Sequence, residues 1–175
     1  MTRQSYNSID SCLPAGRASA ALAMTKFNML TKSKTHTQKI AADLAKKIIS
    51  ESAGKRAVVL ALIGDLGAGK TAFTQGFIKA LGVKTHIPSP TFVIYRRYPI
   101  RKENGGFKNV FHFDLYRIQK PKEIVDLDFR NILNNPENIV LIEWPEVIKK
   151  YLPKKTIWVK LAHSGKANER IINVK

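Results

Sequence analysis

The chain has 175 residues, enough for one domain with a real hydrophobic core, and its 44% hydrophobic and 25% charged residues are ordinary for a globular protein. It contains 30 Lys and Arg against 13 Asp and Glu, and this net charge of +17 indicates either a polyanionic partner such as RNA or a solvated basic surface. The one cysteine, Cys12, excludes an intrachain disulfide and fits a cytoplasmic protein, and no apolar run approaches the roughly 18 residues of a membrane span.

Residues 1–34 are rich in Ser, Thr, Ala and Asn and show no sustained periodicity, so we predict a disordered N-terminal extension. A secretory signal is disfavoured because no apolar core segment is present, whereas a transit peptide fits in part. We favour a third explanation, a start codon placed too early, with Met24 or Met29 as the true start. The domain is then predicted to span residues 35–175 and to open with a helix capped by Thr35.

Residues Gly64 to Thr71 (GDLGAGKT) satisfy the phosphate-binding loop pattern G-x-x-x-x-G-K-[ST]. The apolar run 57–63 before the loop indicates a buried parallel strand, and the spacing of apolar residues over 71–81 predicts a helix. In such a loop, backbone N–H groups and the helix N-terminus bind phosphate, Lys70 contacts the β- and γ-phosphates, and Thr71 ligates Mg²⁺. The order of strand, loop and helix therefore predicts a nucleotide site.

Further along, Pro88 and Pro90 exclude a helix and indicate a stiff, extended turn. The remaining predicted elements are an antiparallel hairpin (92–98 and 109–114), two short helices (121–127 and 128–133), a buried parallel strand (139–142) and a closing hairpin (156–161 and 171–174). This order predicts an α/β fold of the P-loop NTPase type, a three-layer sandwich whose central sheet is mainly parallel with added antiparallel strands.

Two acids, Asp114 and Glu143, each close an apolar strand. Ligands of open α/β sheets lie beyond the carboxyl ends of the strands, so both acids should share a site with the loop. One of them would help Thr71 to hold Mg²⁺, and the other would polarise the attacking water or sense the γ-phosphate. With Lys70 they are our predicted catalytic residues, whereas His112 is predicted to be a half-buried strand residue. Four arginines could stabilise phosphate charge, but we favour the interpretation that they are solvated: Arg96, Arg97, Arg101 and Arg117.

Four motifs in this order resemble the TsaE (YjeE) family of small bacterial ATPases, namely GDLGAGKT (64–71), SPTF (89–92), HFDLYR (112–117) and IEWPE (142–146). The resemblance spans residues 35–175. It implies an Mg²⁺-dependent ATPase, slow without its partners, that is required for threonylcarbamoyl modification of the adenosine beside the anticodon of tRNA. It also implies action with the TsaD–TsaB pair, while direct tRNA contact through a basic surface stays open.

By the family pattern, the nucleotide is bound by Asp65, Leu66, Gly67, Ala68, Gly69, Lys70, Thr71, Ala72, Thr91, Trp144 and Gly165. The resemblance also implies that Thr71 and Glu143 hold Mg²⁺, that Asp114 is important for hydrolysis, and that residues 89–91 act as a switch segment. Members often have a hydroxyl residue at the position of Ala72, so a contact to the α-phosphate would be lost here. Trp144 would lie beside the nucleotide, or simply pack in the protein.

Two other classes of function are open on sequence grounds. A small-molecule kinase on a P-loop scaffold would use an Arg-rich lid, and no clear lid helix follows the arginines. A basic RNA-binding module whose P-loop only gates binding would show no phosphate release. A GTPase is disfavoured because no N-K-x-D motif occurs.

Overall fold

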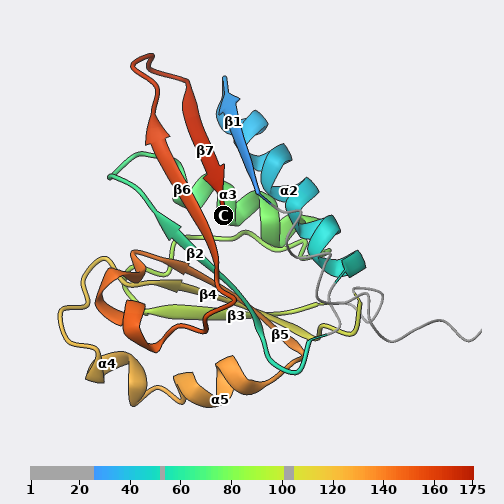
Figure 1. Cartoon of the computed structure of the whole chain (residues 1–175), viewed down its shortest axis with the longest axis vertical. Helices are drawn as coiled ribbons and strands as arrows, with labels where there is room; N and C mark the ends of the chain where they lie inside the picture. Colours follow the sequence, from blue (N-terminus) through green and yellow to red (C-terminus); the bar gives the residue numbers. More distant parts are fainter. Residues whose placement is uncertain (1–25, 52–53, 101–104) are drawn as a thin grey trace, which may run out of the picture.

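In the computed structural model, which describes residues 26–51, 54–100 and 105–175, seven strands form one sheet in the order β1-β7-β6-β2-β5-β4-β3 (Figure 1). The strands are β1 (Phe27–Thr31), β2 (Val58–Ile63), β3 (Tyr95–Pro99), β4 (Asn109–Asp114), β5 (Asn138–Glu143), β6 (Ile157–His163) and β7 (Arg170–Val174). Strands β4, β5, β2 and β6 are parallel neighbours, whereas β3, β7 and β1 pair antiparallel. The mainly parallel sheet with added antiparallel strands is thus confirmed.

Helices cover both faces of this sheet and make three layers. Helices α2 (Lys34–Glu51) and α3 (Lys70–Ala80) pack on one face, in a core that includes Ile48, Phe73 and Leu141. Helices α4 (Lys122–Val125) and α5 (Phe129–Asn134) and the 3₁₀ helix η2 (Pro145–Tyr151) pack on the other face, around Phe113 and Ile142. The alternation of side chains along each strand supplies both cores, and the predicted three-layer sandwich is confirmed.

The parallel strands bring three functional segments to one edge of the sheet. Leu62 of β2 pairs with Glu143 of β5, and Glu143 pairs in turn with Asp114 of β4. The loop that follows β2 leads directly into α3. Both strand-end acids therefore lie beside the phosphate-binding loop, as the sequence predicts.

The predicted disorder of residues 1–34 is wrong for its last part, and residues 1–25 lie outside the described residues. Strand β1 pairs antiparallel with β7 from Phe27↔Val174 to Thr31↔Arg170, a long-range pairing that local sequence does not reveal. Helix α2 then begins at Lys34, and its cap is the Ser33 hydroxyl, which accepts the His36 N–H at 3.0 Å, rather than Thr35. A chain that began at Met29 would lack part of β1.

The strand predicted over residues 92–98 begins only at Tyr95. Residues before it form a turn in which the Val93 N–H donates to the Pro90 carbonyl at 2.8 Å, and Ile94 has a φ of 64°. A β-branched residue rarely adopts this left-handed conformation, so the alternating pattern predicts a longer strand than the chain forms. None of the described helices combines the length and the apolar character that a bilayer-spanning helix requires.

Candidate nucleotide site

A cavity of about 410 Å³ opens at the carboxyl edge of the sheet, within the size range of small-molecule sites. Its lining residues come from the loop, from the segment after α3, and from the ends of β4 and β5: Leu66, Gly67, Gly69, Lys70, Thr71, Ala72, Ser89, Thr91, Asp114, Tyr116, Arg117, Glu143 and Trp144. Most of the predicted site residues are therefore brought together, although Asp65, Ala68 and Gly165 are not among the lining residues.

The loop has the backbone geometry that binds phosphate. Gly64 has a φ of 146°, and a Cβ there would lie 2.1 Å from the Leu161 carbonyl oxygen, so only glycine fits against β6. Gly69, at φ 99°, precedes α3, whose N-terminus has no side-chain cap. The first amides of α3 thus have no side-chain acceptor and face the cavity mouth with the positive end of the helix dipole.

Lys70 lies almost fully buried beneath the loop, with 5% of its surface exposed. Its Nζ donates to the Gly64 carbonyl at 2.6 Å and to the Asp65 carbonyl at 2.9 Å, and lies 3.6 Å from the centroid of the Trp144 ring. Burial lowers the pKa of Lys70, and the negative charges of Glu143, Glu146, Asp114 and Asp65 oppose that shift. The ammonium group is therefore held near the cavity by contacts that a phosphate could replace.

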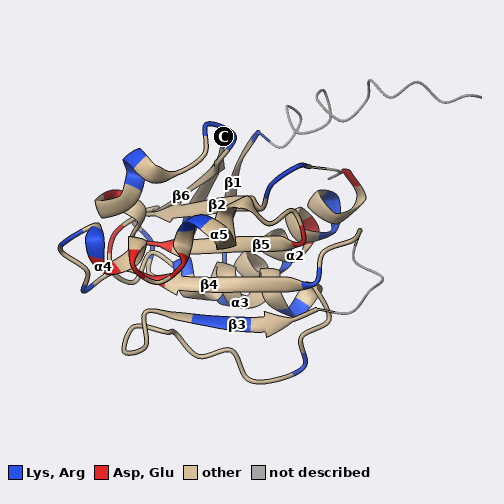
Figure 2. Ribbon diagram, turned by 90° about the horizontal axis from the view of Figure 1, so that it is seen from below, with Lys and Arg blue, Asp and Glu red and all other residues tan. Residues whose placement is uncertain are grey.

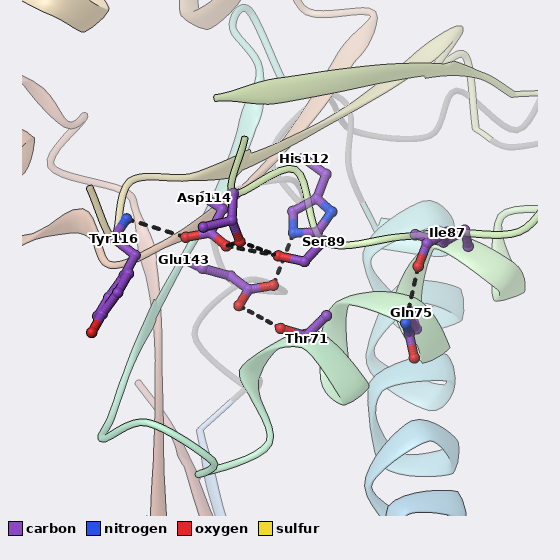
Figure 3. A network of polar contacts seen from close by, with 9 residues as sticks. Thr71, Gln75, Ile87, Ser89, His112, Asp114, Tyr116 and Glu143 are labelled. Carbon is purple, nitrogen blue, oxygen red and sulfur yellow. Dashed lines mark hydrogen bonds and ion pairs between the residues drawn. The ribbon is translucent and has the colours of Figure 1, made fainter. Parts of the chain in front are cut away.

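Glu143 joins the P-loop helix to the sheet (Figure 3). The Thr71 hydroxyl donates to Glu143 Oε2 at 2.9 Å, and Glu143 Oε1 lies 2.8 Å from His112 Nε2. Glu143 is 1% exposed and His112 is fully buried. The predicted half-buried His112 is thus wrong: Val110, His112 and Asp114 alternate along β4, and this period of two is the signal that places His112 on the same face as Asp114.

Asp114 has a different set of partners. Its Oδ2 accepts hydrogen bonds from the Ser89 hydroxyl at 2.7 Å and the Thr91 hydroxyl at 2.5 Å, and its Oδ1 accepts the Tyr116 N–H at 3.1 Å. Figure 3 also shows Gln75 of α3 donating to the carbonyl of Ile87, at 2.9 Å, and Ile87 directly precedes the segment 88–91 that includes Ser89 and Thr91. The segment 88–91 is therefore attached to the strand-end acid through two hydroxyl groups.

The hairpin between β6 and β7 braces the loop from outside the cavity. The Arg170 guanidinium donates to the Gly67 carbonyl from Nε at 3.2 Å and from Nη2 at 3.1 Å, and from Nη1 to the Ala167 carbonyl at 2.8 Å. The ring of His163 approaches the Leu66 carbonyl at 3.4 Å. Gly165 lies at the hairpin turn with a φ of 91°, and its predicted approach to a base remains a prediction.

Several residues that the sequence analysis did not assign to the site lie at the cavity rim. Tyr116 is 53% exposed, and its ring lies 5.1 Å from that of Trp144. The Arg117 guanidinium lies 4.3 Å from the ring of Phe92, which is 82% exposed. Arg96 and Arg97 instead lie exposed on the edge strand β3, as predicted, and Arg101 falls outside the described residues. Spacing alone does not separate Arg117 from these arginines.

The chemistry of the donor set fits a nucleotide with Mg²⁺. A hydroxyl and a carboxylate, those of Thr71 and Glu143, are the oxygen ligands that Mg²⁺ accepts beside phosphate and water. Within the described residues, no group of three or more His, Cys, Asp or Glu side chains is arranged to hold a metal ion by itself. A metal at this site would thus depend on phosphate oxygens, as in P-loop NTPases.

Comparison with known proteins agrees with this geometry. The family model described as "Threonylcarbamoyl adenosine biosynthesis protein TsaE" matches residues 31–172. Proteins named "tRNA threonylcarbamoyladenosine biosynthesis protein TsaE" are similar to the chain: that of Rickettsia felis is 39% identical over 134 residues (76% of this chain and 71% of the relative), and that of Rickettsia typhi is 40% identical over 130 residues (74% and 84%).

The fold has a solved counterpart as well. The crystal structure of Bacillus subtilis YdiB aligns with a TM-score of 0.60 and 31% identity, covering 86% of this chain and 84% of that one. The match of the family model extends from the end of β1 into β7, so it includes the whole cavity. The chain therefore belongs to the TsaE family.

Proposed function

We propose that this protein binds ATP with Mg²⁺ in the cavity and hydrolyses it, in support of the threonylcarbamoyl modification of adenosine in tRNA. One observation supports the site assignment above the others: Thr71, at the start of the P-loop helix, hydrogen-bonds Glu143 at 2.9 Å, and Asp114 lies next to Glu143 in the sheet register. Metal-assisted phosphoryl transfer needs this combination of hydroxyl, strand-end acid and second acid. The names of the relatives supply the pathway.

Each group of site residues has a different role in the proposed reaction. The loop amides and Lys70 bind and orient the phosphates, and Thr71 and Glu143 hold the metal. When bound, Mg²⁺ neutralises charge that builds up on the phosphate oxygens. In this proposal Asp114, whose Oδ2 accepts the hydroxyls of Ser89 and Thr91, orients a water molecule toward the γ-phosphate. Ala72 leaves only its backbone amide for the α-phosphate.

A protein partner at the cavity mouth is part of the proposal. Leu66 is 73% exposed and Phe92 is 82% exposed, and both belong to segments that border the cavity. Exposed apolar side chains around a site favour a protein–protein contact. We therefore propose action with a TsaD–TsaB pair.

Figure 2 shows Lys and Arg on many elements, among them β3 and α4, so tRNA would be attracted by charge rather than read by sequence.

Phosphate release from ATP by the full chain, first alone and then with a TsaD–TsaB pair, tests the proposal. Slow release that rises with the pair is expected, and Lys70→Ala should abolish it. The matched control is Lys79→Ala, because Lys79 is exposed at the other end of α3. No response to the pair, together with phosphate transfer to a small acceptor, would instead indicate a kinase. No release under either condition would leave a nucleotide-gated binding module.

A further inference from the structure

One buried side chain that touches the site has no role in the function proposed above. His112 is fully buried in β4, and its Nε2 lies 2.8 Å from Glu143 Oε1. The other oxygen of the same carboxylate accepts the Thr71 hydroxyl. Glu143 is thus held from two sides, by the P-loop helix and by the neighbouring strand.

The hydrogen-bonding roles of this pair follow from its chemistry. An ionised carboxylate can only accept hydrogen bonds, so Nε2 of His112 bears the hydrogen and donates it. Among the described residues, His112 Nδ1 is buried without a hydrogen-bond partner. The contact with Glu143 is therefore a hydrogen bond that His112 donates from Nε2.

A purely structural role explains the position less well. The residues next to it on the same face of the sheet, Val110 and Leu141, are apolar and fully buried. An apolar side chain would fill this place without a buried, unpartnered nitrogen. Within the part of the chain that the structure describes, the one hydrogen-bond partner of the His112 ring is Glu143, so this contact is what the imidazole ring provides here.

We infer that His112 is a positioning residue, which fixes the Glu143 carboxylate toward Thr71 and Mg²⁺ by donating a hydrogen bond from Nε2. The inference rests on the proposed function. A donor that is fixed in the sheet restricts the rotation of the carboxylate and keeps its other oxygen directed toward Thr71. Removal of a residue that orients a metal ligand typically weakens metal affinity by about 10- to 100-fold.

Two substitutions of nearly equal size test this inference. Gln places an amide nitrogen where His112 has Nε2, whereas Asn places it where His112 has Nδ1. We would measure, by calorimetry, ADP binding to each full-length variant as Mg²⁺ is titrated and again in EDTA. His112→Asn should raise the Mg²⁺ concentration for half-maximal effect about tenfold and leave binding in EDTA unchanged, while His112→Gln should restore most of the Mg²⁺ dependence.

A residue that merely fills space would lower both kinds of binding equally and would not be rescued by Gln. His36→Asn is the control, because His36 lies at the start of α2, where its Nδ1 accepts the Lys32 N–H and its own N–H donates to the Ser33 hydroxyl. The inference is overturned if His112→Asn leaves the Mg²⁺ dependence unchanged. If the unmodified protein shows no Mg²⁺-dependent binding at all, it is the proposed function that fails.

A measurement on the unmodified protein keeps the inference testable if the variants do not fold. Two-bond ¹H–¹⁵N correlation spectra show which nitrogen of an imidazole ring bears hydrogen. His112 should show a hydrogen on Nε2. A ring with no hydrogen on Nε2 would overturn the inference.

Discussion

Asp114 and Glu143 occupy the same kind of place, the last residue of a parallel strand, and pair with each other in the sheet, yet their surroundings differ. Glu143 contacts Thr71 and His112, which belong to a helix and a strand of the sandwich core. Asp114 contacts hydroxyl groups of the loop segment that includes Ser89. The position in the sheet therefore brings both acids to the nucleotide site, whereas their partners differ. Glu143 is held by elements of the core, and Asp114 is bonded to a loop.

Both acids can have their proposed roles only if the phosphates of the nucleotide bind in the cavity. Lys70→Ala tests this condition, and we expect it to have the largest effect of these substitutions. Hydrogen bonds to charged groups are each worth about 1.5–3 kcal/mol, so losing two of them should weaken ATP binding by about 100-fold or more. Equilibrium binding of a fluorescent ATP analogue measures the loss. Full affinity in Lys70→Ala would show that nucleotide binds elsewhere.

The metal-holding role of Glu143 is tested by Glu143→Gln, which keeps the shape of the side chain and removes its charge. Turnover with Mg²⁺ should fall by about 1,000-fold, while ATP binding in EDTA should stay unchanged. Glu123→Gln is the control, because Glu123 is exposed in α4 and is not one of the residues that line the cavity. An equal loss in both assays would mean that Glu143 supports the loop rather than a metal.

Asp114→Asn should separate the two acids. Turnover should fall by about 100-fold, as expected for a residue that orients water, but the Mg²⁺ concentration for half-maximal binding should not change. The measurement is phosphate release at saturating ATP beside the same Mg²⁺ titration, with the exposed Asp126→Asn as control. A raised Mg²⁺ requirement would mean that both acids hold the metal.

Loss of a hydrogen bond between Asp114 and its loop should reduce turnover least among these substitutions. Ser89→Ala removes one of two hydroxyl donors to Oδ2, so turnover should fall by only about 2- to 10-fold. In a protein that already has Asp114→Asn, the same substitution should cost little more, because the pair acts as a unit. Additive losses of turnover in this double-mutant cycle would mean that the Ser89 hydroxyl does not act through Asp114.

The fold and the centre of the site were predictable because their signals are local. Alternation, apolar runs and the glycine pattern of 64–71 follow from the chain's own backbone and burial requirements. Strand β1 was not predictable, since its pairing with β7 joins residues far apart in sequence. The turn at Ile94 contradicts a β-branched preference, and the partner of His112 lies on another strand, where only the parallel register brings it within reach.

The Arg170 contacts with Gly67 join the phosphate-binding loop to the C-terminal hairpin, and β1 extends this connection, because the Thr31 hydroxyl donates to the Arg170 carbonyl at 3.3 Å. Loop, hairpin and β1 should therefore open and close as a single cooperative unit. In native-state hydrogen exchange, the amides of β7 would then gain protection on nucleotide binding, although none of them lines the cavity. A substitution that weakens the pairing of β1 with β7 should therefore lower the affinity for ATP, although β1 lies far from the cavity in the sheet order.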